Sequence, residues 1–300
     1  MIPYSATLGY ATLLDRLSVS ALAELDRLMA SVANESPEVQ QEALMDLLPI
    51  LGDQYVGASS LVSAQFFTEL QDINGVRKPV PAETLDGVGA KRWHSLAGWG
   101  SAPAIFEQGG AALVYSLLSG GLTKILTEAA ADTMVGNAEI QGSMRAQRVP
   151  RSGCCAFCGM LASRFADYES VESATTVVGR GVPVGKGRGH GSKGKGRGIK
   201  ARGARAIGEE FHDHCRCRVV VLTKNNYAEL QSTADKYYDS YSAAAQKAGE
   251  GRRLEWVETK SSDGSLNRQY TWVNAEGKAR TAQDHTKDIL AAMRQDLGVR

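Results

Sequence analysis

The segment Phe211–Leu222 reads FHDHCRCRVVVL and places a ligand-rich motif directly before the clearest strand of the chain. The three consecutive valines near its end are β-branched, and such runs favour a buried strand. Ahead of them, His212, Cys215 and Cys217 follow the order H-x-x-C-x-C. We therefore expect a strand over 217–222 whose start carries side chains that can bind a metal.

An upstream segment, CCAFCGMLASRFADY (154–168), holds a C-x-x-C pair formed by Cys155 and Cys158, followed by residues with helical character. Zinc favours tetrahedral coordination by thiolate and imidazole, which two short-range ligand pairs from distant segments can supply. All five cysteines lie between Cys154 and Cys217, unlike the dense pattern of a secreted disulfide scaffold. We predict one zinc site that joins the two segments, and a soluble protein made in a reducing cytosol.

The two motifs offer more ligands than the four that zinc takes. The favoured set combines the C-x-x-C pair with His212 and Cys215. A second set replaces either His212 or Cys215 with Cys217, and a third uses the C-x-x-C pair with Cys215 and Cys217. The neighbouring Cys154 and His214 are expected to point away from the metal.

Nothing in these motifs indicates catalysis at the metal. The chain lacks H-E-x-x-H, and it lacks the deaminase order in which H-x-E precedes P-C-x-x-C. A closed, thiolate-rich site is usually structural. G-x-S-x-G, a P-loop and a Rossmann fingerprint are also absent from the sequence. We predict no catalytic residue, and an enzymatic role is the less favoured reading.

Between the two cysteine motifs, residues 179–205 form a basic insert that reads GRGVPVGKGRGHGSKGKGRGIKARGAR, with glycines and cations but no acid. Such a composition cannot bury enough apolar area to offset its ordering entropy, so we expect disorder in isolation. Its cations can neutralise the phosphates of packaged double-stranded DNA. The predicted DNA contacts are Lys186, Arg188, Lys193, Lys195, Arg197, Lys200, Arg202 and Arg205.

The first half of the chain reads as helical. Apolar residues at spacings near three and four predict one helix over about 14–32, and Pro37 suits the first turn of a second. Pro49 is expected to kink or end that helix, with a third from about Gln54 to Asp72. Residues 76–90 form a loop or domain joint, after which helices are expected to continue to about Gln147.

Two tryptophans and three arginines stand out in that second helical stretch. Trp93 and Trp99 are interpreted as packing anchors. Arg145, Arg148 and Arg151 are three residues apart, so at least the first two are expected to share a helical face, either as a basic stripe or as a solvated surface.

Beyond the valine strand, the pattern predicts a helix over about 225–247, a β-hairpin turning near 263–264, and a last helix over about 282–297. Trp256 and Trp272 fall on the two hairpin strands. The longest uncharged stretch, 108–123, is too short and too rich in glycine for a membrane span.

We therefore predict an α+β fold that is predominantly helical. An N-terminal helical domain precedes a small metal-clasped α+β domain with a β-hairpin and a C-terminal helix. The predicted regions are 1–75 and 76–147 (both helical), 148–224 (metal-binding, with insert 179–205) and 225–300 (helix, hairpin and terminal helix).

The phrases C-A-F-C-x-M-L-A-S-R and F-H-D-x-C-x-C, on either side of a basic insert, resemble the phage Mu protein F-like family of minor head (minor capsid) proteins. The match is to the type found in actinobacterial phages, often labelled capsid maturation protease. The resemblance implies that Cys155, Cys158, His212, Cys215 and Cys217 belong to the family motif. His214 stands where a small polar residue is expected, and Cys154 is an additional thiol.

The resemblance also implies a role in head morphogenesis. The protein would lie in the virion, inside the capsid near the portal, after assembly in the host cytoplasm. Its expected partners are the portal protein, the major capsid or scaffolding protein and packaged DNA, with no membrane. The alternative is a capsid maturation (prohead) protease, for which Cys154 is the one spare thiol. A cellular nucleic-acid-binding protein is a third hypothesis, which the balanced net charge of +1 disfavours.

Overall fold

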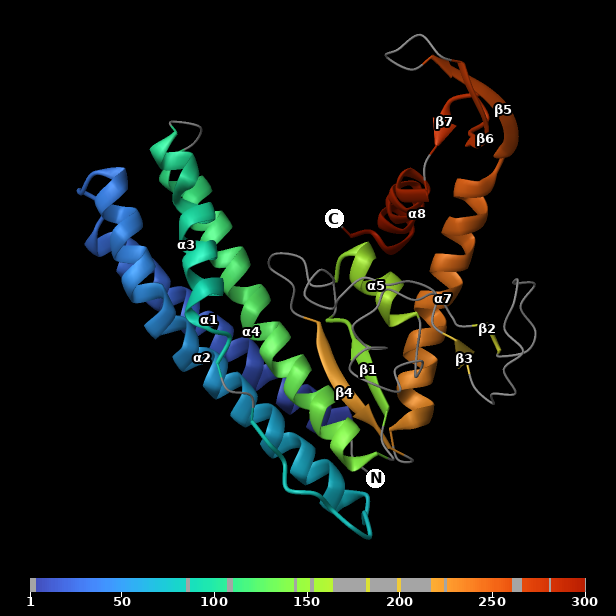
Figure 1. Cartoon of the computed structure of the whole chain (residues 1–300). Coiled ribbons are helices and arrows are strands. Elements are labelled where there is room, and N and C mark those ends of the chain that lie inside the picture. Colours follow the sequence, from blue (N-terminus) through green and yellow to red (C-terminus); the bar gives the residue numbers. More distant parts are fainter. Residues whose placement is uncertain are drawn as a thin grey trace. The chain divides into compact units, whose positions relative to one another are not determined.

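The computed structural model divides the chain into two compact units (Figure 1). The first unit comprises 1–151 and 164–231, and the second comprises 152–163 and 232–300. The structure describes residues 4–84, 87–106, 110–142, 145–151, 154–163, 182–183, 199–200, 217–223, 226–260, 266–280 and 282–299.

Four long helices form the core of the first unit: α1 (Tyr4–Ser31), α2 (Pro37–Ile73), α3 (Ala90–Ile105) and α4 (Ala111–Gln141). Ser36 caps α2, because its side chain accepts a hydrogen bond from the Val39 N–H at 3.4 Å. Buried leucines from all four helices pack in one cluster with Trp93, which is fully buried as predicted for a packing anchor. Trp99, predicted to be a second anchor, is instead 53% exposed.

Helix α2 continues through Pro49, so the prediction of separate helices on either side of this proline is wrong. A proline removes one backbone hydrogen bond from a helix, and packing on both sides of it can offset that loss. Leu48 is fully buried, and the Trp93 ring lies against Gly52, where an added Cβ would come within 2.5 Å of it. Tertiary contacts therefore hold the helix together across this position.

Within the connection between α2 and α3, residues 76–84 form a strap that two buried amides hold on the helices. Gln71 of α2 accepts the Val80 N–H at 2.9 Å and donates to the Val80 carbonyl at 2.8 Å. Asn137 of α4 makes the same pair of bonds with the backbone of Glu83, both at 2.8 Å. Each amide thus satisfies a backbone donor and acceptor of the strap, as a neighbouring strand would.

A two-stranded antiparallel sheet also belongs to the first unit. Strand β4 (Arg218–Leu222) confirms the strand predicted from the valine run, and it pairs with β1 (Arg145–Val149) in the register Gln147↔Val220. The predicted helix up to Gln147 is wrong at its end, because Gly142 adopts a left-handed φ of 69° and terminates α4. Arg148 is consequently buried in a strand, not part of a solvated helical stripe.

The second unit is built mainly from helices with one antiparallel sheet. It contains α5 (Ala156–Ala162), most of α7 (Tyr227–Gly249) and α8 (Ala282–Leu297). The predicted hairpin is confirmed as β5 (Arg253–Lys260) and β6 (Leu266–Val273), with Lys260 opposite Leu266, and β7 (Ala279–Arg280) adds a short third strand. The turn predicted near 263–264 lies outside the described residues.

Within the basic insert, β2 (Val182–Pro183) and β3 (Ile199–Lys200) form a short antiparallel pair. The rest of the insert lies outside the described residues. Over its described part the chain is predominantly helical with small antiparallel sheets, which confirms the predicted balance of secondary structure.

Candidate metal centre

The C-x-x-C motif lies at the start of α5, where Cys155 is the N-cap residue. Its backbone is extended (φ −67°, ψ 161°), and its Sγ accepts a hydrogen bond from the Cys158 N–H at 3.4 Å. Backbone N–H groups at a helix start favour thiolate over thiol, and the thiolate is the form that binds metal. Cys158 is buried, with 2% of its surface exposed. The donor types and this local geometry suit a zinc-binding pair.

Helix α5 is short, and tertiary contacts within the second unit fix its position. Cys154 Sγ donates to the Tyr237 hydroxyl of α7 at 3.5 Å. A Cβ added at Gly159 would lie 2.9 Å from the Tyr237 ring, so this glycine allows the close approach of α5 to α7. Ala156 and Met160 pack with residues of α7 and α8 in one apolar cluster. The cysteine pair is therefore presented by a packed helix.

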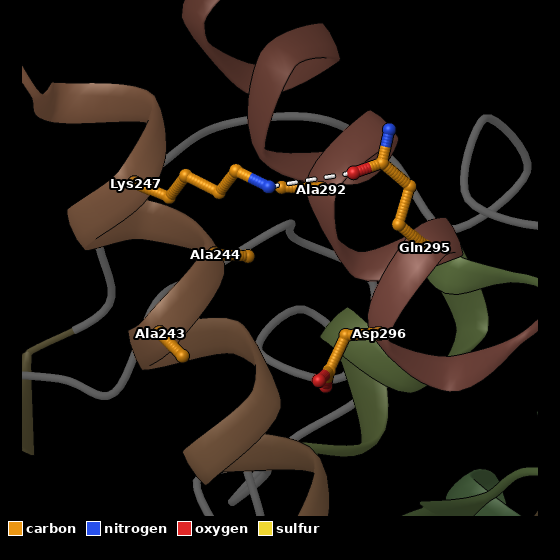
Figure 2. A pocket seen from close by; sticks show the side chains of 6 residues that line it. All are labelled: Ala243, Ala244, Lys247, Ala292, Gln295 and Asp296. Atoms are coloured by element: carbon orange, nitrogen blue, oxygen red, sulfur yellow. Dashed lines mark hydrogen bonds between the residues drawn. The ribbon is translucent and has the colours of Figure 1, made fainter.

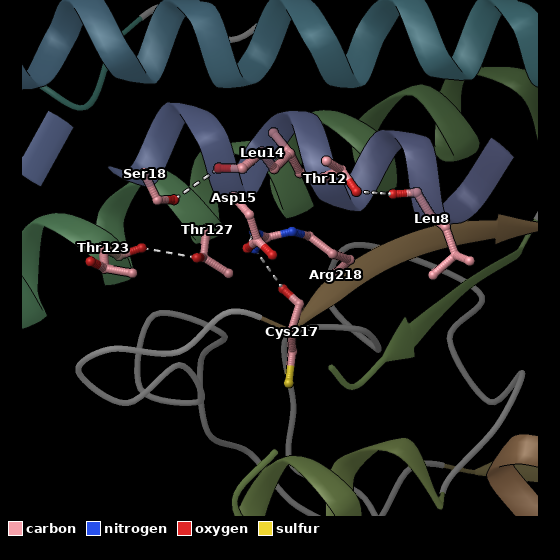
Figure 3. Close-up of polar contacts among 9 residues, drawn as sticks. All are labelled: Leu8, Thr12, Leu14, Asp15, Ser18, Thr123, Thr127, Cys217 and Arg218. Atoms are coloured by element: carbon pink, nitrogen blue, oxygen red, sulfur yellow. Dashed lines mark hydrogen bonds and ion pairs between the residues drawn. The ribbon is translucent and has the colours of Figure 1, made fainter. Parts of the chain in front are cut away.

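Cys217 lies in the first unit, at the residue immediately before β4, and is 2% exposed. The following residue, Arg218, donates through Nη1 to the Cys217 carbonyl at 3.4 Å and through Nη2 to Asp15 of α1 at 2.6 Å. Figure 3 shows the Cys217 carbonyl directed toward the Arg218 guanidinium and its sulfur pointing away from Asp15. An arginine–carboxylate pair thus fixes the backbone at the entry to β4.

The five predicted ligands fall into three groups in the structure. Cys155 and Cys158 are together in the second unit, and Cys217 belongs to the first. His212 and Cys215 lie outside the described residues, as does His214. Among the residues that the structure describes, no three histidine, cysteine or acidic side chains gather around a common point. The ligand set and the zinc itself therefore stay predictions.

The predicted DNA contacts are likewise almost entirely outside the described part of the chain. Of these eight cations only Lys200 falls on a described element, the two-residue strand β3. The DNA contact therefore stays a prediction as well.

A charged cluster that the sequence did not reveal lies between α3 and α4. Arg92 forms an ion pair with Glu128, whose side chain is 2% exposed. The other carboxylate oxygen of Glu128, Oε1, has no hydrogen-bond partner among the described residues. One turn along α4, burial raises the pKa of Asp132 to about 6, an effect that the charge of Arg92 partly offsets. The available signal in the sequence was the pair Glu128 and Asp132, four residues apart in a helix whose neighbouring residues are largely alanines.

A shallow groove lies between α7 and α8 in the second unit (Figure 2). Ala243, Ala244 and Ala292 are among its lining residues. Lys247 Nζ donates to Gln295 Oε1 across it at 3.4 Å, and Asp296 accepts the Ser240 hydroxyl at 2.5 Å. These bonds join the two helices. The groove brings together no nucleophile, base and oxyanion donor of the kind that catalysis needs.

One comparison with known proteins gives a match. The family model described as VG15 protein matches residues 1–244, which include both cysteine motifs and the basic insert and end within α7. No curated protein matches the chain, and no solved structure matches it. No described helix combines the length and apolar character that crossing a membrane requires.

Proposed function

Because the chain belongs to the VG15 protein family, a family of phage proteins, we propose that it is a minor capsid protein that acts in head morphogenesis. The observation that carries the proposal is the family match over 1–244, which spans the two cysteine motifs and the insert between them. The finer assignment to the Mu F-like type rests on the residue pattern of those motifs and is part of the proposal.

The proposed zinc site would use Cys155 and Cys158 at the start of α5, with His212 and Cys215 as the favoured second pair. The bond from the Cys158 N–H to Cys155 Sγ supports the first half of this site. Bound zinc would supply structural cross-linking, since both ends of the long intervening segment would meet at one point. Loop-closure entropy grows slowly with length, so a long insert between ligand pairs is tolerable.

The proposed place of action is the capsid interior near the portal, with portal protein and major capsid or scaffolding protein as partners. The eight cations of the basic insert would contact packaged DNA through its phosphates, without reading sequence. In this proposal the packed helices bind other head proteins and the basic insert binds nucleic acid, which is a structural role.

Inactivating the gene in its parent phage and supplying variants in trans tests this role. We expect loss of infectious particles with abnormal or DNA-free heads, and rescue by the unaltered chain. Normal filled heads that fail at a later step, such as tail attachment or host entry, would overturn the assignment to head morphogenesis.

A further inference from the structure

An exposed apolar stripe runs along the first half of α2. Val39 and Leu47 are each 44% exposed and Ile50 is 70% exposed, while Ala43 fills the gap between the first two. Spacings of three and four residues place all four on one helix face. Large aliphatic side chains aligned on an exposed face mark a surface that another molecule covers. We refer to these four residues as the α2 stripe.

A row of acids borders the α2 stripe on one side. Glu38, Glu42 and Asp46 follow one another at intervals of four residues. Each directly precedes a stripe residue in the sequence, so the acids form a parallel row beside the stripe on the helix surface. They line a groove between α2 and α3, in which His94 is the only other ionisable side chain. At neutral pH this border therefore presents three negative charges and no fixed positive charge.

The opposite border of the α2 stripe is a second groove, between α1 and α2. Leu28 and Leu51 contribute to its apolar lining beside the stripe residues Leu47 and Ile50. Its charged members, Glu24 and Arg27, are of opposite sign, and Glu24 also accepts a hydrogen bond from Tyr55 at 2.9 Å. The stripe is thus an apolar ridge with one acidic flank and one neutral flank.

We propose that the α2 stripe is the docking surface for an amphipathic helix of a partner protein, with basic residues along the flank that meets Glu38, Glu42 and Asp46. A ridge between two grooves that run along a helix matches the way helices pack through ridges and grooves. The acid row selects a basic flank, since opposite charges across an interface favour the right partner and exclude acidic ones.

A second copy of this chain is a poorer occupant in an antiparallel arrangement. In an antiparallel helix pair the same flank of each helix faces its counterpart, so the two acid rows would oppose each other. The inference rests on the proposed function for its biological setting, in which the helix belongs to another head protein. The surface itself is tested separately, with purified components.

The test measures binding of a synthetic peptide to the full chain by fluorescence anisotropy. The probe is an amphipathic helix of leucine and lysine, about 18 residues or roughly five turns long. Three variants are compared with the unaltered chain. Leu47→Ser with Ile50→Ser removes the ridge, Glu38→Gln with Glu42→Gln and Asp46→Asn neutralises the flank, and Leu113→Ser with Ile140→Ser is the matched control on exposed apolar positions of α4.

We expect Leu47→Ser with Ile50→Ser, the ridge variant, to weaken binding by about tenfold or more, since a few apolar anchors contribute most of the binding free energy of such interfaces. The neutralised variant should weaken binding by roughly threefold to tenfold at low salt and flatten its salt dependence. The control should stay within about twofold. Circular dichroism confirms that each variant keeps its helices.

Three results would overturn the inference: no binding of the lysine peptide, equal affinities for the ridge variant and the control, or an affinity that neutralisation leaves unchanged. Sedimentation equilibrium adds a fourth. If the unaltered chain is a dimer that Leu47→Ser with Ile50→Ser dissociates, a second copy occupies the stripe. A normal phenotype in the gene-inactivation experiment would instead count against the proposed function and leave the peptide result standing.

Discussion

Asn137 of α4 and Glu83 of the strap are joined by two hydrogen bonds, one in each direction between the Asn137 amide and the Glu83 backbone, both 2.8 Å long. The same amide nitrogen also donates to the Thr133 carbonyl at 2.8 Å. Asn137 is 2% exposed, so water cannot readily replace these partners. The Asn137 side chain therefore ties the strap over 76–84 to the helical core.

Asn137→Ala should lower the free energy of unfolding by about 2–3 kcal/mol, because it leaves a backbone donor and acceptor of the strap without partners. Urea denaturation followed by circular dichroism measures the change. Gln141→Ala is the matched control, since its amide makes a single exposed bond to the Lys78 carbonyl at 3.2 Å. Equal losses for the two variants would show that Asn137 does not hold the strap.

Two glycines of α2 should respond in opposite ways to alanine. At Gly52 the new Cβ would lie 2.5 Å from the Trp93 ring, so Gly52→Ala should destabilise the fold by about 1–3 kcal/mol. At Gly57 nothing lies within 4 Å, so Gly57→Ala should stabilise it by about 0.5–1 kcal/mol through helix propensity alone. Thermal melts of both variants measure the difference. A stabilised Gly52→Ala protein would contradict the contact between α2 and Trp93.

The raised pKa of Asp132 makes stability depend on pH. Its folded pKa is about 6 against an ordinary 3.8, so the folded state holds this proton more tightly than the unfolded state. The protonated carboxyl therefore favours folding, and this contribution is present below about pH 4 and lost as the pH rises through 6.

Asp132→Asn should remove that dependence and raise stability at pH 7 to 8 by about 1–3 kcal/mol. Denaturation curves between pH 4 and 8 measure the effect, with the exposed Asp26→Asn as control. If Asp132→Asn were less stable than the unaltered chain at pH 7.5, the attraction between the Asp132 carboxylate and Arg92 would outweigh the cost of burying that carboxylate.

The zinc proposal predicts one zinc ion per chain after purification under reducing conditions, as measured by elemental mass spectrometry. Cys155→Ser and His212→Ala should each lose most of the metal, because a tetrahedral site with three ligands binds far more weakly. Cys154→Ser should keep it, since this thiol bonds to Tyr237. A chain that binds no zinc, or loses it only with Cys154, would contradict the predicted ligand set.

The DNA proposal predicts that deleting 185–205 weakens binding to double-stranded DNA and reduces its salt dependence. Neutralising each phosphate contributes a slope of roughly −0.9 in the logarithm of affinity against the logarithm of salt concentration. Replacing the eight cations by glutamine, at unchanged length, separates charge from loop length. Unchanged affinity at low salt in both variants would exclude the insert as the DNA contact.

Local sequence patterns were sufficient to predict those helices and strands that are determined by their own residues. The valine run, the hairpin and the helices α7 and α8 were predicted close to their observed bounds because β-branching, alternation and apolar periodicity act over a few residues. Strand β1 was missed because RAQRV has no strand pattern of its own, and it becomes a strand by pairing with the buried β4. Arg148 is buried for the same reason.

Long-range packing explains the other differences. Pro49 was expected to interrupt a helix that the core on both sides keeps continuous. The pairing of Asn137 with the strap, and of Arg92 with Glu128, joins residues far apart in the chain. No periodicity encodes such pairs. For the metal centre, sequence predicted the ligand types, and the structure adds the capped start of α5.

Quantitative peptide mass spectrometry of purified virions and proheads tests the central claim most directly, with the portal and major coat proteins as internal references. A minor head protein should be present in both particles at a few intact copies for each portal ring. Presence in proheads with absence from mature virions, or recovery only as cleaved fragments while coat processing proceeds, would contradict that role and favour a maturation protease.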